Sequence, residues 1–218
     1  MRADNILTIE TSLGRIFLTI MKKSYLFSKC IESPRSIEQD LNKLLEDLFY
    51  EAKIGYNKID IILVSIGPGS FTGIRIGISV AKAIALCTEA KIIGYSNFFS
   101  IYHQFKAINK NINLKKVHIL VKGPRDEYFK KIYSNNVEGK KNYLITKKKL
   151  LSSNFSKNTF IAGNFSNKIS IKNYYYCLPD NLGLEKLIIN IKENLNSYKY
   201  KEPMPLYIKE HYANKNHK

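Results

Sequence analysis

A glycine-rich turn at residues 67–73 is where the residue types and spacing first suggest chemistry. It follows an aliphatic run at residues 61–66 and precedes an apolar helical pattern, so its backbone amides lie where a strand–turn–helix unit can bind a phosphate. The turn lacks the Gly-Lys-Ser/Thr ending of a Walker loop, and Pro68 removes an amide that a phosphate would use. We therefore interpret the turn as structural and assign no cofactor-binding residue to it.

No nucleophile or metal site is predicted. Ser70 fails the Gly-x-Ser-x-Gly pattern of a nucleophile elbow because Pro68 and Thr72 flank it. The four histidines stand apart without ligand spacing: His103, His118, His211 and His217. The three cysteines form no disulfide framework and are expected to be buried thiols of a reducing cytosol: Cys30, Cys87 and Cys177. We assign no catalytic residue and no metal ligand.

The elements around the turn predict an α/β fold. Strands are expected at residues 6–9, 15–20, 25–30, 61–66 and 91–95, with helices at 37–52 and 74–86. Short connections make the first three strands an antiparallel meander. Ser36 and Gln39 fit a capping box at the start of the first helix, and Gly55 is expected to stop it. Ser70 or Thr72 is expected to cap the second helix.

This order, three antiparallel strands followed by βαβ units, is that of an actin-like (ribonuclease-H-like) half-domain. In such folds the first strand usually ends in an acidic residue near the metal–nucleotide site, and Glu10 occupies that place. A single carboxylate is weak support for such a site. The other charged cluster, Arg125-Asp126-Glu127, is interpreted first as a solvated turn.

The second half of the chain has weaker patterns. A helix is expected at residues 97–109, and a polar hinge at 106–116. Strands at 117–121, 127–133, 143–145 and 160–162, helices at 147–151 and 184–195, and an extended segment at 202–208 follow. We predict an N-terminal actin-like lobe at residues 1–105 and a smaller second lobe at 106–218, whose tail packs back on the first.

Charge is unevenly distributed along the 218 residues, whose formal net charge is +17. Residues 1–105 hold 12 Lys and Arg against 10 Asp and Glu, whereas residues 106–218 hold 23 against 8. A nucleic-acid or phosphate-rich partner of the second lobe is one explanation, and an A+T-rich coding sequence is the other. We see no apolar run long enough for a membrane span and no signal peptide, so a cytoplasmic location is expected.

The helical pattern at residues 74–86 is unusually apolar. Its polar residues, Arg75, Ser79 and Lys82, form one narrow stripe, so apolar flanks would remain after one side packs on a sheet. Two explanations stay open. The helix lies inside a three-layer domain, or it is shared with a partner protein, because soluble monomers rarely expose large apolar patches.

Residues 67–77, Gly-Pro-Gly-Ser-Phe-Thr-Gly-Ile-Arg-Ile-Gly, closely resemble the signature of the TsaB (YeaZ) family. Shorter matches occur in the same order as in the family. They are Glu10-Thr11-Ser12 in place of Asp-Thr-Ser, Arg125 with Glu127-Tyr128, and Pro205-Leu206-Tyr207-Ile208 followed by Lys209 in place of Arg. Arg35-Ser36 stands where the family commonly has His-Ser, and residues 135–200 match loosely.

The resemblance implies a non-catalytic subunit with a degenerate nucleotide site. TsaB-like proteins pair with TsaD, which carries a metal and transfers a threonylcarbamoyl group to the adenosine beside the anticodon of tRNA. The ATPase TsaE joins the pair, so the partner subunits are expected to use ATP, Mg and a metal. TsaB-like proteins can also form homodimers. The alternative is an ATP-binding enzyme, such as a kinase, or a peptidase-like protein of the same fold acting alone.

Pairing in this family uses helices of the first half-domain. We therefore expect nine residues of the two predicted helices to contribute to the core or to the pairing face, with Arg75 and Lys82 at its polar edge. They are Leu41, Leu45, Leu48, Ile74, Arg75, Ile78, Ala81, Lys82 and Ala85. A glutamate at Ile78 is expected to abolish pairing or folding.

Overall fold

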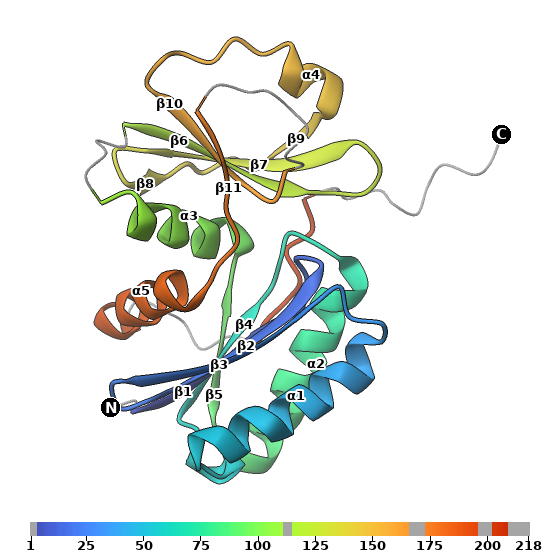
Figure 1. The fold of residues 1–218 in the computed structure, drawn as a ribbon, viewed down its shortest axis with the longest axis vertical. Helices are drawn as coiled ribbons and strands as arrows, with labels where there is room; N and C mark the ends of the chain where they lie inside the picture. The colour runs from blue at the N-terminus through green and yellow to red at the C-terminus, as the bar shows by residue number, and fades with distance from the viewer. Residues whose placement is uncertain (1–3, 111–114, 166–172, 196–201, 209–218) are drawn as a thin grey trace, which may run out of the picture.

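The computed structural model describes residues 4–110, 115–165, 173–195 and 202–208, which form two β-sheets with helices between and outside them (Figure 1). The first sheet has the strand order β3-β2-β1-β4-β5. Its strands are β1 (Asn5–Glu10), β2 (Arg15–Lys22), β3 (Tyr25–Glu32), β4 (Ile61–Ser65) and β5 (Lys91–Tyr95). The meander β1–β2–β3 is antiparallel, and β4 and β5 continue the sheet parallel to β1. The predicted actin-like fold is confirmed.

Helices α1 (Ile37–Ala52) and α2 (Phe71–Thr88) cover one face of the first sheet (Figure 1). Ser36 caps α1 as predicted, since its side chain accepts the amide of Gln39 at 3.4 Å. The predicted stop at Gly55 is wrong by two residues, because Lys53 adopts the left-handed conformation and ends the helix. Of the two candidate caps for α2, Ser70 is the one used, at 3.2 Å from the amide of Gly73.

The second sheet has the strand order β11-β10-β6-β7-β8, with β9 also paired to β7. Its strands are β6 (Lys116–Lys122), β7 (Glu127–Ser134), β8 (Val137–Glu138), β9 (Tyr143–Thr146), β10 (Thr159–Gly163) and β11 (Tyr174–Tyr176). Sequence reasoning missed β8 and β11, which are two and three residues long and carry no periodicity. Of the predicted hinge, residues 106–108 continue helix α3 (Asn97–Ile108), and residues 111–114 lie outside the described residues.

Helices α3 and α5 (Asn181–Glu193) lie side by side between the two sheets, as Figure 1 shows. α3 packs on the second sheet, whereas α5 returns to the first sheet and covers the face opposite α1 and α2. The short helix α4 (Lys147–Leu151) packs on the outer side of the second sheet. The division at residue 105 stays a prediction, and the chain itself interleaves the two lobes.

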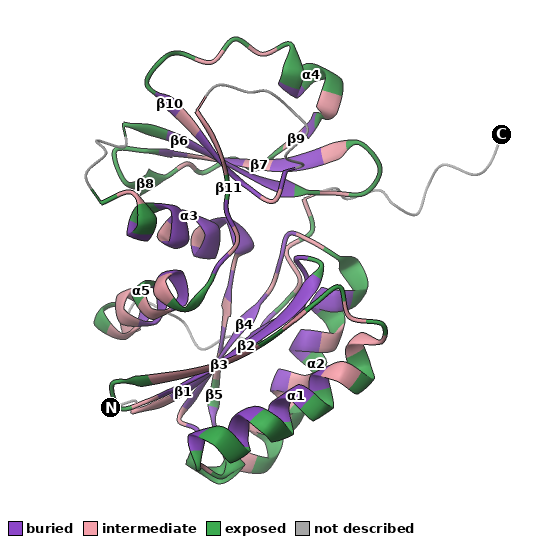
Figure 2. Ribbon diagram, viewed as in Figure 1, coloured by how far each residue is buried: buried purple, intermediate pink, exposed green. Residues whose placement is uncertain are grey.

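Burial follows these layers: buried residues run along both sheets and along the inner faces of the helices (Figure 2). α2 departs from this pattern. Among the described helices it is the one long and apolar enough to cross a membrane by length and composition, yet one side of it, with Ile74, Ile78 and Ala81, belongs to the first lobe's core. Only 28% of the residues of this helix are buried.

Candidate functional site

The glycine turn packs directly on the end of β1. A Cβ atom at Gly73 would lie 2.0 Å from the carbonyl oxygen of Thr11, and one at Gly69 would lie 2.5 Å from that of Ser12. The same contact continues into α2, where a Cβ at Gly77 would lie 2.5 Å from the Thr11 hydroxyl. These three glycines therefore let α2 approach the β1–β2 turn more closely than any side chain would allow.

Hydrogen bonds fix this approach. The Thr11 hydroxyl donates to the carbonyl of Gly73 at 2.6 Å, and the amide of Ser70 donates to the carbonyl of Ser12 at 2.8 Å. An amide that a phosphate cradle would offer is thus bonded within the protein. The glycine spacing has a packing explanation that requires no ligand.

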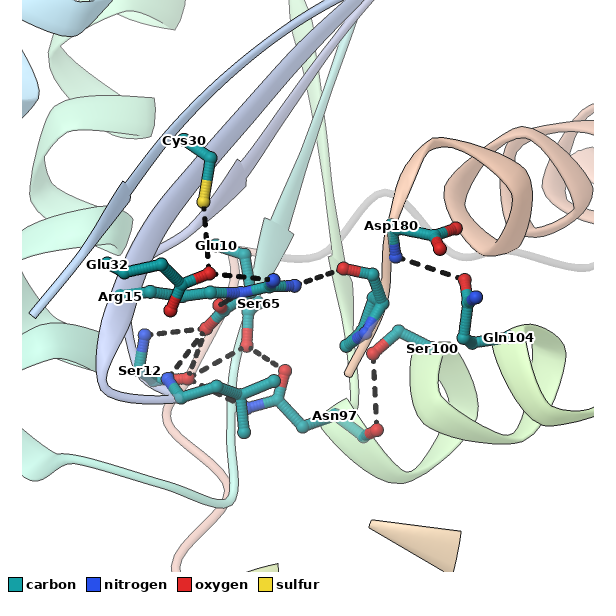
Figure 3. A network of polar contacts seen from close by, with 12 residues as sticks. Glu10, Ser12, Arg15, Cys30, Glu32, Ser65, Asn97, Ser100, Gln104 and Asp180 are labelled. Atoms are coloured by element: carbon teal, nitrogen blue, oxygen red, sulfur yellow. Dashed lines mark hydrogen bonds and ion pairs between the residues drawn. The ribbon is translucent and has the colours of Figure 1, made fainter. Parts of the chain in front are cut away.

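A buried polar network joins the two turns to α3 (Figure 3). The side-chain amide of Asn97 donates to the Ser12 hydroxyl at 2.7 Å and to the carbonyl of Pro68 at 2.8 Å. Its side-chain oxygen accepts the Ser65 hydroxyl at 2.8 Å. Since Asn97 begins α3, the network joins the first sheet to the helix that supports the second.

Glu10 is completely buried at the end of β1 (Figure 3). Its Oε1 accepts the amide of Ser12 at 2.6 Å, the Ser12 hydroxyl at 2.9 Å and the amide of Leu13 at 3.0 Å. Burial raises the pKa of this carboxyl, and the Arg15 guanidinium opposes that shift. Its Oε2 lies 3.9 Å from Arg15 Nε, and neither atom has a hydrogen-bond partner. This carboxylate faces into the protein, so its setting does not fit a metal–nucleotide ligand.

Arg15 connects this cluster to the segment that leads into α5. Its guanidinium donates to the carbonyl of Pro179 and lies 3.4 Å from Glu32 Oε1 (Figure 3). The Arg15 guanidinium also makes a cation–π contact, with its Cζ 4.8 Å from the centroid of the Phe17 ring. The arrangement neutralises and orients groups inside the protein, and its contacts are structural.

The described residues contain no cluster of three His, Cys, Asp or Glu side chains that could hold a metal. His103 lies on α3 beside Phe99, and His118 lies in β6 beside Phe155. Burial lowers the pKa of each imidazole to about 4, with help from neighbouring lysines. The other two histidines lie outside the described residues. Cys177 is buried as expected, but Cys30 and Cys87 are exposed, so that expectation was wrong for two of the three thiols.

A cleft of about 600 Å³ opens between the lobes. Four segments line it, together with Phe129 and Asn164: residues 12–14 after β1, the glycine turn with the start of α2, residues 122–124 at the end of β6, and residues 206–208. Its wall is mainly apolar, and Lys122 is the one cationic side chain among its described lining residues. A triphosphate with its metal would meet one lysine and no free carboxylate here, so these residues do not fit a Mg-nucleotide.

Six of the nine expected interface residues lie in the core of the first lobe, where α1 and α2 meet the sheet. They are Leu41, Leu45, Leu48, Ile74, Ile78 and Ala81, all nearly inaccessible to solvent. The core is one of the two places expected for these residues, and the stripe that packs on the sheet is not accessible to a partner. Of the remaining three, Arg75 is exposed and stacks 3.8 Å over Phe71, Lys82 pairs with Glu202, and Ala85 is half-buried.

A different stripe of α2 is accessible. Ser79, Ala83, Leu86 and Cys87 are exposed along it, whereas Ile76 and Val80 are half-buried against the core. Leu86 is 88% exposed, and a groove of about 360 Å³ beside Ile76 and Val80 is bounded by Glu38 and Asn42 of α1. Helical periodicity alone does not say which apolar stripe faces the sheet. The small residues Gly73, Gly77 and Ala81, four apart, are the signal that identifies the packed side.

Comparisons with known proteins agree with this architecture. A family model described as "TsaD: tRNA N6-adenosine threonylcarbamoyltransferase" matches residues 32–153, more than half of the chain. A protein of Buchnera aphidicola subsp. Schizaphis graminum, named tRNA threonylcarbamoyladenosine biosynthesis protein TsaB, is 33% identical over 119 residues. The chain belongs to the TsaB family. TsaB of Escherichia coli is 34% identical over 68 residues, which are 31% of this chain and 29% of that protein.

The first match covers 55% of this chain and 54% of the Buchnera protein, so this chain spans about half or less of the length of these two curated relatives. The structure "YeaZ from Pseudomonas aeruginosa" superimposes with a TM-score of 0.75 at 17% identity, over 94% of this chain and 99% of that one. At that identity the likeness shows the fold alone.

Proposed function

We propose that this TsaB-family chain is a non-catalytic, cytoplasmic subunit of the machinery that makes threonylcarbamoyladenosine in tRNA, and that it pairs with a TsaD-like protein. The names of its relatives support the pathway. The packed glycine turn and the inward-facing Glu10 support a non-catalytic role, since neither offers a reacting group to the cleft. The TsaD-like partner then supplies the metal and transfers the threonylcarbamoyl group, and a TsaE-like ATPase joins the pair.

The accessible stripe of α2 is the observation that carries the pairing proposal. Only 28% of the residues of this apolar helix are buried, which leaves an apolar surface that soluble proteins normally cover. Its small side chains allow a second helix to approach closely. Arg75 and the Lys82–Glu202 pair border the stripe with charge, which matches the polar rim of a protein–protein interface.

Pairing is tested by exchanging Ala83, an exposed small residue of the stripe, for arginine. The long charged side chain should hold the two surfaces apart and weaken binding to the TsaD-like partner by about 2 kcal/mol or more. Val137 is 68% exposed on the second sheet, so Val137→Arg is the matched control and should bind as wild type. Titration calorimetry gives the affinity, and circular dichroism confirms that both variants fold.

Equal binding by Ala83→Arg and wild type would refute the α2 stripe as the pairing surface. Ile78→Glu, in the core, should instead unfold the chain. Loss of self-association in Ala83→Arg, without any binding to the TsaD-like protein, would show that the stripe joins two copies of this chain. Formation of threonylcarbamoyladenosine in a reconstituted system, with and without the chain, tests the pathway itself.

A further inference from the structure

The outer face of the second sheet, which points away from α3, carries lysines within its strands. Val117, Ile119 and Val121 of β6 pack towards α3, so the alternate residues Lys116 and His118 point outward. On β7 the same alternation sends Lys130 outward, opposite Leu120 of β6. Lys149 on α4 borders this side of the sheet. We call Lys116, Lys130 and Lys149 the lysine face.

The three lysines are close enough to affect one another. Lys130 is half-buried between strands, and its ammonium lies 5.0 Å from the centroid of the Tyr143 ring on β9. Burial lowers the pKa of Lys130, and the charges of Lys116 and Lys149 lower it further. Positive charges held in this way repel one another in the free protein, so a polyanion would bind here with a gain in electrostatic energy.

Few carboxylates oppose this charge. Glu138 is engaged with Lys131 at 3.1 Å, and Lys131 alternates onto the α3 side of β7. Asp126 precedes β7 and Glu127 begins it, but three further lysines at residues 147–157 outnumber them: Lys147, Lys148 and Lys157. Positive charge is therefore concentrated on this face of the sheet, in addition to the general excess of lysine in residues 106–218.

The side chains between the lysines indicate which polyanion fits. Tyr143 is 40% exposed beside Lys130, and it presents a ring on which an unpaired base can stack. Spaced cations with an aromatic ring among them suit a phosphodiester chain, which carries one charge per nucleotide. An acidic peptide would use the cations but would gain little from the ring.

We propose that the lysine face binds the phosphodiester backbone of RNA, with Tyr143 as a stacking surface. Naming tRNA as the RNA rests on the proposed function. The lysine face lies on the outer side of the second sheet, and α1 and α2 lie on the far side of the first (Figure 1). The chain can therefore hold RNA and a protein partner at the same time.

The test compares two triple variants of the full chain that lose the same charge. One is Lys116→Gln/Lys130→Gln/Lys149→Gln, and the other changes three exposed lysines elsewhere, Lys23→Gln/Lys58→Gln/Lys186→Gln. Binding of labelled tRNA is measured by anisotropy at several salt concentrations. We expect the first variant to bind about tenfold more weakly and its salt slope to fall by about two, because each lost phosphate contact removes roughly 0.7–0.9 from the slope. The control should change less than about twofold.

Equal losses in the two variants would overturn the proposal, because they would show a dependence on net charge alone. No binding by the wild-type chain at about 50 mM salt would also overturn it. Polyglutamate of matched charge serves as a competitor for the labelled tRNA. If polyglutamate displaces tRNA as effectively as unlabelled tRNA does, the lysine face is assigned to acidic proteins instead. An unrelated RNA of equal length distinguishes RNA binding in general from tRNA binding. If it binds as well as tRNA, the lysine face is an RNA-binding surface, but the result gives no support to the proposed function.

Discussion

Gly73 is the residue of the glycine turn at which an added side chain would have the least space. A methyl group there would lie 2.0 Å from a backbone oxygen of Thr11, and that oxygen belongs to a turn held by its own hydrogen bonds. We expect Gly73→Ala to lower the free energy of unfolding by about 3 kcal/mol or more. Neither the β1–β2 turn nor the first turn of α2 can move away without losing hydrogen bonds. Urea denaturation measures the change.

Ser79→Ala is the control for this substitution, because Ser79 lies on the exposed side of the same helix. Alanine is the better helix former, so this variant should be as stable as wild type within about 0.5 kcal/mol. A Gly73→Ala protein of wild-type stability would show that the turn is not as tightly packed as described.

His118 should make stability depend on pH. Burial, with the charges of Lys130 and Lys116, lowers its pKa to about 4 from 6.5. Between those values the unfolded chain binds a proton that the folded chain does not, so stability falls as pH drops from 6.5 to 4. His118→Gln should be less sensitive to pH over this window. An NMR titration in which the His118 ring takes up its proton near pH 6.5 would contradict the expected burial.

Residue-level reasoning found part of the site. The sequence places an acidic residue at the end of β1, and Glu10 lies there. It does not show that Arg15 faces this carboxylate and bonds to the carbonyl of Pro179, 164 residues away. That contact depends on the return of the chain to the first lobe, which no local pattern records.

Gln104 joins two elements that the sequence does not show to be neighbours. From α3, its side-chain oxygen accepts the amide of Asp180 at 3.0 Å (Figure 3). The same oxygen accepts the amide of Gly183 at 2.9 Å, in the first turn of α5. Gln104→Met keeps the length of the side chain and leaves a buried amide of Gly183 without this acceptor. We expect a loss of about 2 kcal/mol in thermal or urea unfolding.

Asp180→Ala provides the comparison for Gln104→Met. Asp180 caps α5 by accepting the amides of Leu182 and Gly183, so its removal should cost about 1 kcal/mol. Because both side chains bond to the amide of Gly183, the effects of the two substitutions should not add. Strict additivity in the double variant would mean that the two acceptors act independently.

Most elements could be predicted, whereas their partners could not. The apolar spacing of Leu184, Leu187 and Ile188 predicts an amphipathic helix, but periodicity does not say which sheet its face meets. The same limit applied to α2, where the pattern left the core side and the accessible side undecided. Small residues in the sheet-facing stripe resolve that question once their contacts are known.

The whole molecule is tied together by this crossing of elements between lobes. α5 comes from the second half of the chain but completes the core of the first sheet with Leu184, Leu187, Ile188 and Ile191. Four buried side chains of this kind contribute on the order of 6–12 kcal/mol, which is comparable to the stability of an entire domain. The predicted boundary at residue 105 therefore need not be a folding boundary.

A fragment of residues 1–105 should fail to fold alone for this reason. Without α5, seven buried residues of the first sheet would be exposed to solvent: Ile6, Phe17, Met21, Ile61, Leu63, Ile93 and Tyr95. We expect the fragment to aggregate or to bind a hydrophobic dye, with no cooperative thermal transition, and a peptide of residues 179–195 to restore that transition in part. Leu187→Asp in the full chain should reproduce the defect, because it places a charge in the same core. Cooperative unfolding of the fragment by itself would instead establish residues 1–105 as an independent lobe, with α5 as an accessory to it.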